Sequence, residues 1–388
     1  MKDYSTANII NIALTGHAST GKTTLVETML FNVGAIHTMG SIDAGTTISD
    51  YREYEIKNQH SISLSMINLE WQEKKINILD TPGYLDFHGE VKSALRVADF
   101  AAIVVSAVEG IDIGTELCWE YADKDYNIPK LFIINMTDKE KANFDTVLSS
   151  LKSRYGRAVF PFTLPVNQGP VSNQVADVLR KEVFTFKADG SGDYSEETAD
   201  GDWSQRMEEL HNELMELIAE SDESLLEVFF DKGELSEEEL RNGLHQALKS
   251  GGLIPVFCVS GEKNIGVKRM MDILAKYAPC AGDFKEVIGT KPGSDEELIQ
   301  GPSVNDPLAA LVFKTISEEH IGEMSFFRVY SGKVNVGDDL QNTSHNNSEK
   351  MRQIYFMNGK NRKDAPQLIA GDIGATLKLK NTHTGNTL

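Results

Sequence analysis

The sequence predicts an α/β protein in which a doubly wound, mainly parallel sheet is followed by a small antiparallel β-barrel. Short apolar runs that suit buried parallel strands alternate with helical segments from residue 12 to about residue 134. Polar motifs follow directly after several of these runs, and in doubly wound sheets the carboxyl ends of the strands hold the ligand. From Pro307 onward, short alternating runs are separated by glycine-bearing turns, which is typical of a small barrel.

The composition is that of an ordinary globular protein, with 388 residues, 40% apolar and 25% charged, so two or three domains are expected. Cys118, Cys258 and Cys280 lie far apart, which fits a reducing compartment and indicates neither a disulfide framework nor a metal cluster. The N-terminus has no secretory signal, and no apolar run reaches the roughly 18 residues of a membrane helix. We therefore expect a cytoplasmic protein that does not enter a membrane.

The net charge of −20 is unevenly distributed. Between Lys181 and Ser250 there are 20 acidic residues and 6 basic ones. Such a surface repels nucleic acid and suits a basic protein partner, although it is also what a merely solvated acidic face looks like. We do not expect this chain to bind free DNA or RNA.

A phosphate-binding loop is predicted near the N-terminus. The apolar run Ile12 to Leu14 leads into a stretch that fits Gly-x-x-x-x-Gly-Lys-Ser/Thr, and an amphipathic helix follows. The backbone N–H groups of such a loop wrap a phosphate chain at the positive end of the helix. Lys22 would reach the β and γ phosphates, and the Thr23 hydroxyl would bind Mg²⁺. The predicted cradle consists of Gly16, His17, Ala18, Ser19, Thr20, Gly21, Lys22, Thr23 and Thr24.

The next motif is Asp80-Thr81-Pro82-Gly83. Residues 41–58 before it are polar and without sustained periodicity, and they indicate a mobile surface segment. Residues 61–66 and 75–79 then predict two paired strands. A carboxylate at the end of such a strand, here Asp80, holds Mg²⁺ through water in nucleoside triphosphatases with a phosphate loop, and Gly83 would offer its N–H to the γ-phosphate. Asp-x-x-Gly alone is a common turn, so the prediction that Asp80 and Gly83 belong to the nucleotide site rests on their position directly after the strand.

A third motif, Asn135-x-x-Asp138, follows the apolar run at residues 130–134. An Asp here can accept two hydrogen bonds from guanine, and adenine has no matching pair of donors. Taken alone, the motif could be a helix N-cap. As the third in an ordered series it predicts GTP and GDP as the ligands.

With these motifs the sequence resembles the translational GTPases, and most closely elongation factor G and its paralogues. The resemblance rests on the three motifs, on Val256 to Gly261 ahead of Asn264 to Val267, and on Phe326 to Gly332 in the second domain. It implies that Ser260 and Gly261 lie against the guanine edge. It also implies domain bounds of 1–281 for the GTPase domain, 282–305 for a linker and 306–388 for the barrel.

The resemblance also explains the acidic stretch, because elongation factor G carries an insertion before the last base-binding strand. Here an α+β insertion at about 166–252 fills that place and by analogy faces basic stalk proteins of the ribosome. The barrel would face ribosomal RNA and ribosomal proteins. Elongation factor G has three more domains, so the chain is expected to be a fragment of a longer protein and to act as a monomer.

Several positions depart from the family pattern. The catalytic histidine of the family, which positions the attacking water, is Tyr84 here, and a phenol is a poor base at neutral pH. The acidic residue of the phosphate loop is Ser19. The family's Arg-Gly-Ile-Thr is Asn58 to Ser61, so Ser61 is the expected Mg²⁺ ligand, with Ser63 as the alternative. Met136 replaces a lysine under the base and can still pack on a purine.

These changes preserve nucleotide and Mg²⁺ binding more clearly than hydrolysis. We expect a GTPase with catalytic residues Lys22, Gly83 and Tyr84, acting as a ribosome-associated factor of the elongation factor G type with slow hydrolysis. The alternatives are a ribosomal protection protein, which the large insertion disfavours, and a nucleotide-binding switch with little or no hydrolysis.

Overall fold

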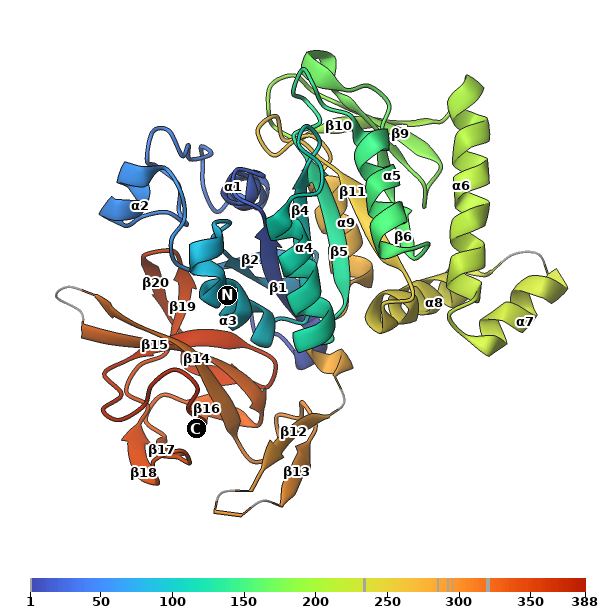
Figure 1. The fold of residues 1–388 in the computed structure, drawn as a ribbon. Coiled ribbons are helices and arrows are strands. Elements are labelled where there is room, and N and C mark those ends of the chain that lie inside the picture. Colours follow the sequence, from blue (N-terminus) through green and yellow to red (C-terminus); the bar gives the residue numbers. More distant parts are fainter. Residues whose placement is uncertain (1, 233–234, 285, 292, 295, 319–321) are drawn as a thin grey trace.

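The structure, a computed structural model, describes residues 2–232, 235–284, 286–291, 293–294, 296–318 and 322–388. Its largest element is a seven-stranded sheet in the order β2-β3-β1-β4-β5-β11-β6 (Figure 1). All neighbours in this sheet are parallel except the edge strand β2, which pairs antiparallel with β3. The strands are β1 (Ile9–Gly16), β2 (Ser65–Trp71), β3 (Lys74–Asp80), β4 (Phe100–Ser106), β5 (Lys130–Asn135), β6 (Val159–Pro161) and β11 (Ile254–Cys258).

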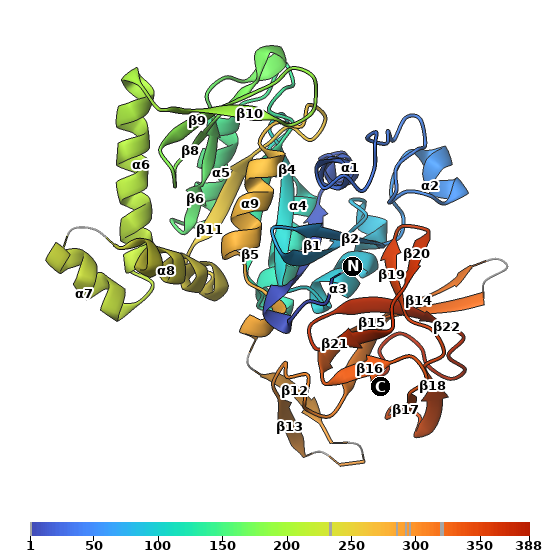
Figure 2. The ribbon, with the colours of Figure 1, turned by 180° about the vertical axis from the view of Figure 1, so that it is seen from behind.

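Helices cover both faces of this sheet, so the predicted doubly wound architecture is confirmed. In Figure 1 α4 and α5 lie in front of the sheet, and in Figure 2, seen from behind, α9 lies in front. The helices that cover the sheet are α1 (Lys22–Asn32), α3 (His88–Arg96), α4 (Ile113–Glu120), α5 (Phe144–Tyr155) and α9 (Val267–Tyr277). The short helix α2 (Glu53–Asn58) lies apart from the sheet (Figure 1). Short turns η1 (Thr6–Asn8), η2 (Leu85–Phe87) and η5 (Ala281–Asp283) adjoin them, and a π-helical turn, η3 (Tyr121–Asp125), extends α4.

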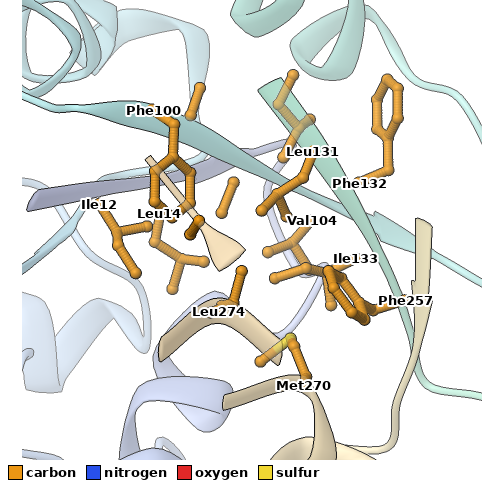
Figure 3. Packing of buried hydrophobic residues seen from close by; sticks show 14 of the residues in the cluster. Ile12, Leu14, Phe100, Val104, Leu131, Phe132, Ile133, Phe257, Met270 and Leu274 are labelled. Carbon is orange, nitrogen blue, oxygen red and sulfur yellow. The ribbon is translucent and has the colours of Figure 1, made fainter. Parts of the chain in front are cut away.

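The central strands are apolar on both faces because both faces are covered. Every residue of β1, β4, β5 and β11 is buried. Figure 3 shows how Leu14, Val104 and Ile133 from neighbouring strands meet Met270 and Leu274 of α9. This packing places the carboxyl ends of β1, β3, β4 and β5 side by side.

Residues 163–250 carry a second, smaller sheet, which begins just before the predicted insertion at about 166–252. Four antiparallel strands lie in the order β10-β9-β8-β7, and long helices follow them in the chain. The elements of this region are β7 (Thr163–Pro165), η4 (Gly169–Val171), β8 (Gln174–Asp177), β9 (Glu182–Phe186), β10 (Tyr194–Thr198), α6 (Gly201–Ala219), α7 (Glu223–Lys232) and α8 (Glu237–Ser250). The acidic residues of α6 and α8 lie mostly on exposed positions, whereas Met207, Leu214 and Leu244 are buried.

Residues 282–305 contain an element that the sequence pattern did not anticipate. The strands β12 (Val287–Thr290) and β13 (Glu297–Gln300) pair as an isolated antiparallel ribbon (Figure 1). Residues 285, 292 and 295 of this segment lie outside the described residues.

The C-terminal domain is antiparallel, as predicted for the second domain. Its five-stranded sheet has the order β14-β15-β22-β19-β20, and two short strand pairs complete the domain. The strands are β14 (Ala309–Glu318), β15 (Gly322–Ser331), β16 (Lys333–Asn335), β17 (Asp339–Asn342), β18 (Asn347–Lys350), β19 (Tyr355–Asn358), β20 (Asn361–Asp364), β21 (Gln367–Ile369) and β22 (Ile373–Leu377).

Strand β14 shows how this domain docks on the GTPase domain. Ala310 and Val312 belong to the interior of the barrel, whereas Leu311 and Phe313 belong to the core that is continuous with the large sheet. Because successive side chains of a strand point to opposite faces, one strand closes the barrel and also seals the interface. Among the described residues, no helix is both long and apolar enough to cross a membrane.

Candidate functional site

A cleft of about 550 Å³ opens at the carboxyl ends of β1 and β3. It is the place where the predicted motifs converge, because parallel strands bring their ends to one edge of the sheet. Its walls are Ala18, Ser19, Gly21, Lys22, Thr23, Thr24, Met39, Gly40, Ser41, Ile42, Asp43, Asp50, Gln59, His60, Ser61, Gly83, Tyr84, Met136 and Glu262. A larger cleft, about 730 Å³, lies between α8 and α9, and oppositely charged side chains such as Arg269 and Asp272 line it.

The loop between β1 and α1 has a conformation that requires its two glycines. Gly16 has φ +138°, and a Cβ there would lie 2.3 Å from the carbonyl oxygen of Val104. Gly21 has φ +83°, and a Cβ there would lie 2.5 Å from Nδ2 of Asn135. The loop therefore packs directly on two neighbouring strand ends, and the N–H groups of the first turn of α1 open toward the cleft.

Lys22 closes this loop from inside. Its Nζ donates to the carbonyl oxygens of Gly16 at 3.0 Å and His17 at 2.7 Å. Burial lowers the pKa of Lys22, and the Asp80 carboxylate acts against that shift. Gly83 lies against the same loop, because a Cβ on it would lie 2.6 Å from Ala18 Cα and from Lys22 Nζ. The ammonium group and the Gly83 backbone thus flank the same part of the cleft.

Hydroxyl and carboxylate groups meet at the start of α1. Thr23 Oγ1 donates to Asp80 Oδ2 at 3.0 Å and lies 3.3 Å from Ser61 Oγ. Ser63 lies elsewhere, since Lys314 Nζ donates to its Oγ at 2.5 Å and Leu64 beside it is tied to Glu90. The geometry therefore favours Ser61 over Ser63 as the serine that joins Thr23 and Asp80.

Asp50 belongs to this cluster and was missed in the sequence, because residues 41–58 have no periodicity that would distinguish a buried carboxylate. Burial and the neighbouring Asp80 raise the pKa of Asp50 to about 7. Burial likewise raises the pKa of Asp80 to about 6, against the effects of Ser49, Lys22 and Thr23. Among the described residues no well-aligned hydrogen bond reaches either oxygen of Asp50 or Oδ1 of Asp80, although the hydroxyls of Ser61 and Ser49 are near Asp50 and Asp80 respectively. Such carboxylate oxygens beside two hydroxyls are a donor set that fits a hard cation such as Mg²⁺.

The third motif and the loop after β11 lie beside the cleft, to whose walls they contribute Met136 and Glu262. Asn135 Nδ2 donates to the Thr20 carbonyl at 2.9 Å, and its Oδ1 accepts from the Gly261 N–H at 2.9 Å. Ser260 Oγ donates to Asp138 Oδ1 at 2.7 Å. Asn135 thus ties the phosphate loop to the loop at 260–261, and Ser260 orients Asp138.

Met136 lines the cleft in a left-handed conformation, with φ +67°. Its terminal methyl group faces Gly21, at 3.3 Å from the position of a Cβ there. Ser19 is also left-handed, with φ +61°, and lines the same cleft. Thr20 and Thr24 complete the loop, with Thr20 Oγ1 donating to the His17 carbonyl at 3.0 Å.

Tyr84 stands at the mouth of the cleft with 43% of its surface exposed. Its ring lies 4.6 Å, centroid to centroid, from the ring of His60. The cleft is thus lined by predicted residues of the phosphate loop and by Ser61, Gly83, Tyr84 and Met136. Asp80 and Asn135 do not line it but are hydrogen-bonded to the phosphate loop, and Ser63 lies elsewhere. Asp50 and His60, both from the segment before β2, were not predicted.

Comparisons with known proteins agree with this geometry. Residues 7–280 match the family described as the Elongation factor Tu GTP binding domain, and residues 307–388 match Elongation factor G domain 2. The crystal structure of ttk003000868 from Thermus thermophilus superposes with a TM-score of 0.86 and 28% identity, covering 98% of this chain and 54% of that one. The present chain thus spans about half the length of that protein. The two matched families cover nearly all of the sequence, and the chain belongs to the translational GTPases of the elongation factor G type.

Proposed function

We propose that this protein binds GTP and GDP with Mg²⁺ and works as a ribosome-associated switch of the elongation factor G type that hydrolyses GTP slowly. The observation that carries this proposal is the convergence of Thr23, Ser61 and Asp80 beside a cleft that Met136 and Glu262 also line. The hydrogen-bonded pair of Asp138 and Ser260 lies two residues along the chain from each of these lining residues. A triphosphate site and a guanine site are then joined by the loop from Gly16 to Thr24.

Each group of residues has a distinct part in binding. The N–H groups from Gly16 to Thr24 would cradle the phosphates, and Lys22 would release its two carbonyl partners to reach the β and γ phosphates. Thr23 and Ser61 would hold Mg²⁺ by their hydroxyls, with Asp80 acting through water. When bound, the ion neutralises charge on the phosphate oxygens. Asp138 would accept hydrogen bonds from the guanine edge, and the backbone of Ser260 and Gly261 would flank the base.

Slow hydrolysis follows from Tyr84. A phenol can donate a hydrogen bond, but it accepts a proton poorly at neutral pH. With Gly83 close to the phosphate loop, the site can hold a γ-phosphate more readily than it can activate water. A switch with little or no hydrolysis is the second candidate, and Tyr84 at the family histidine position is the observation that favours it. A ribosomal protection protein stays the third.

The two added domains would meet different partners. Residues 181–250 carry 20 acidic and 6 basic side chains, a surface suited to basic stalk proteins. Residues 306–388 carry 10 basic and 9 acidic side chains, so this barrel does not repel RNA. We propose that the protein acts in the cytoplasm as a monomer, with no DNA or membrane partner.

The test is nucleotide binding and turnover. GTP should bind far more tightly than ATP, because adenine lacks the pair of N–H donors that the Asp138 carboxylate would accept from guanine. An ATP affinity equal to that for GTP would exclude the guanine assignment. Turnover with and without ribosomes, measured on the full-length protein, separates a slow GTPase from a switch that never cleaves.

Replacing Tyr84 by histidine is a sharper prediction. Tyr84→His should raise single-turnover GTP cleavage with ribosomes by at least roughly 10-fold, because the imidazole can position the attacking water. Tyr84→Phe serves as the matched control, since it keeps the ring and removes only the hydroxyl. Equal rates for Tyr84 and Tyr84→His would refute slow hydrolysis caused by this position.

A further inference from the structure

The ring beside Tyr84 is an imidazole from a different part of the chain. His60 follows α2 and directly precedes Ser61, the serine that lies beside Thr23. The ring centroids of His60 and Tyr84 are 4.6 Å apart with planes tilted by 55°, and Phe87 lies 6.2 Å from His60. Both His60 and Tyr84 line the same cleft as Ala18, Thr23 and Gly83.

The backbone holds His60 in this place. Gln59 ends α2 in the left-handed conformation, with φ +55°, and the His60 N–H donates to the Glu55 carbonyl at 3.3 Å. Glu55 itself is buried, and its carboxylate accepts from the N–H groups of Ile62 and Ser63 at 3.1 Å each. The turn from 59 to 63 is therefore tied on both sides of the histidine.

The hydrogen bond of the ring determines which nitrogen can accept. His60 Nδ1 lies 3.2 Å from the carbonyl oxygen of Ser61. A carbonyl oxygen only accepts, so Nδ1 must carry the hydrogen and donate it. In the neutral ring Nε2 then has the free lone pair, which is the arrangement by which histidines are oriented as acceptors in active sites.

We propose that His60 supplies the imidazole that Tyr84 lacks and orients the water that attacks the γ-phosphate. This inference rests on the proposed GTPase function. Water donates a hydrogen bond to Nε2 of His60, and its oxygen forms a bond to the γ phosphorus. The bond from that phosphorus to the β–γ bridging oxygen breaks, and its electron pair leaves with GDP. The proton lost by the water goes to an oxygen of the released phosphate, so the ring orients the water and ends unchanged.

The position of His60 also explains why hydrolysis would be slow and conditional. The ring belongs to the segment that carries Ser61, so it reaches the cleft only when this segment is folded over the phosphate loop. Tyr84 then supports the imidazole, with its ring in tilted contact with that of His60. Hydrolysis would depend on both the order of residues 59–63 and the contact between the rings of His60 and Tyr84.

The test distinguishes the contribution of the His60 ring nitrogens from that of the contact between its ring and Tyr84. His60→Phe keeps an aromatic ring against Tyr84 and removes the acceptor, so intrinsic single-turnover cleavage should fall at least about 10-fold with GTP affinity unchanged. His60→Gln retains an acceptor and should keep more activity than His60→Phe. His345→Phe, at an exposed barrel position, is the matched control and should leave cleavage unchanged.

A second substitution, at Tyr84, returns an imidazole to the site after His60 has been replaced. Tyr84→His in the His60→Phe background should bring cleavage back to within about 3-fold of the Tyr84→His variant alone, as expected when two side chains fill one role. The tautomer can be read without turnover, because ¹⁵N spectra of the nucleotide-free chain should show the His60 hydrogen on Nδ1. Assignment is possible by comparison with His60→Gln.

Three results would overturn the inference: full cleavage by His60→Phe, loss of GTP affinity in step with cleavage, or the hydrogen on Nε2. A wild-type chain that binds GTP and never cleaves it would also overturn it. Failure of the wild-type chain to bind GTP is a different outcome, since that would remove the proposed function itself.

Discussion

Two of the contacts between the barrel and the GTPase domain differ in burial and in the residues that they join. The first, called the basal contact, joins Lys75 to Asp372 and Asp99 to Arg328 below the amino ends of the strands. The second, called the cleft-side contact, joins Lys314 to Glu90 and Gly359 to Ile48 beside the segment that folds over the nucleotide cleft. Figures 1 and 2 show the barrel against β2 and α3, below the helix α2.

The basal contact is a closed network of buried polar groups. Lys75 Nζ lies 2.6 Å from Asp372 Oδ2, and Arg328 Nη2 lies 2.7 Å from Asp99 Oδ1, with each side chain at most 6% exposed. Asn11 and Asn77 link the two pairs. Asn11 Nδ2 donates to Asp99 Oδ2 at 2.9 Å, and Asn77 Nδ2 donates to Asn11 Oδ1 at 2.8 Å and to Asp372 Oδ1 at 3.1 Å. A network of this kind sets one orientation of the barrel and tolerates little movement.

The cleft-side contact is more open and involves parts of the chain that nucleotide would move. Lys314 Nζ contacts Glu90 and donates to Ser63 Oγ at 2.5 Å, but the Glu90 side chain is 30% exposed. Gly359 approaches the carbonyl of Ile48 so closely that a Cβ would lie 1.9 Å from that oxygen. The barrel is therefore fixed mainly by the buried ion pairs at its base, and its contact with residues 48–63 and α3 is the weaker of the two.

The largest expected effect tests the basal anchor. Arg328→Met should lower the free energy of unfolding by about 3–5 kcal/mol, because it leaves the Asp99 carboxylate buried without its cation. Lys314→Met should cost only about 1 kcal/mol, since the Glu90 carboxylate can be hydrated and keeps the N–H of Leu64. Urea unfolding of both variants measures the difference.

The control for this prediction removes both charges. Asp99→Leu combined with Arg328→Met should recover most of the loss, because two apolar side chains leave no buried charge behind. Equal costs for Arg328→Met and Lys314→Met would mean that the two contacts do not differ as their burial indicates.

A smaller effect is expected at the hairpin of β19 and β20, whose turn carries Gly359 in the cleft-side contact. Gly359 has φ +54°, so Gly359→Ala meets both backbone strain and the Ile48 carbonyl. Gly201 has φ +51° with nothing near its Cβ position, and Gly201→Ala therefore measures the strain alone, at about 1 kcal/mol. Gly359→Ala should cost about 1–2 kcal/mol more and should speed hydrogen exchange at residues 46–50. Equal exchange in the two variants would show that the hairpin does not hold this segment.

The sequence predicted the fold class and the residues of the three motifs, because each depends on local patterns. Buried strands read as apolar runs, and a phosphate loop has fixed spacing. It did not predict Asp50 or His60, since both lie in a segment without periodicity whose burial depends on docking against Ser61 and Tyr84. It likewise gave no sign that Lys75, on a strand of mixed polarity, is paired across a domain boundary. The ribbon of β12 and β13 was overlooked because its short runs lie among acids, Gly and Pro.

The smallest effect concerns a third contact, which ties the insertion to the end of the GTPase domain. His245 on α8 places Nδ1 3.1 Å from the Tyr277 carbonyl and Nε2 2.8 Å from Asp283 Oδ1. Both partners are acceptors, so the ring makes both bonds only when both nitrogens carry hydrogen. The hydrogen bond to Asp283 raises the pKa of His245 above its ordinary value. Burial acts to raise the pKa of Asp283, but the bonds from His245 and Cys280 outweigh it and lower the pKa to about 2.

These pKa shifts make the stabilising effect of the contact depend on pH, and the effect is lost both as pH rises and as pH falls. A histidine whose pKa is raised on folding contributes its full stabilisation below about pH 6.5, the pKa of histidine in the unfolded chain. This contribution is lost as pH rises through the pKa in the folded protein. A lowered aspartate pKa stabilises above about pH 4 and is lost as pH falls toward 2. Wild type minus His245→Leu should therefore show a stability difference on the order of 1 kcal/mol near pH 5 to 6 that shrinks toward pH 9. Urea unfolding midpoints of both proteins across this pH range measure the stability difference. Groups that titrate equally in both proteins cancel in that difference. A difference that grows toward pH 9 would mean that the neutral ring is the form that stabilises the junction, and this contact would then depend less on charge than the basal contact does.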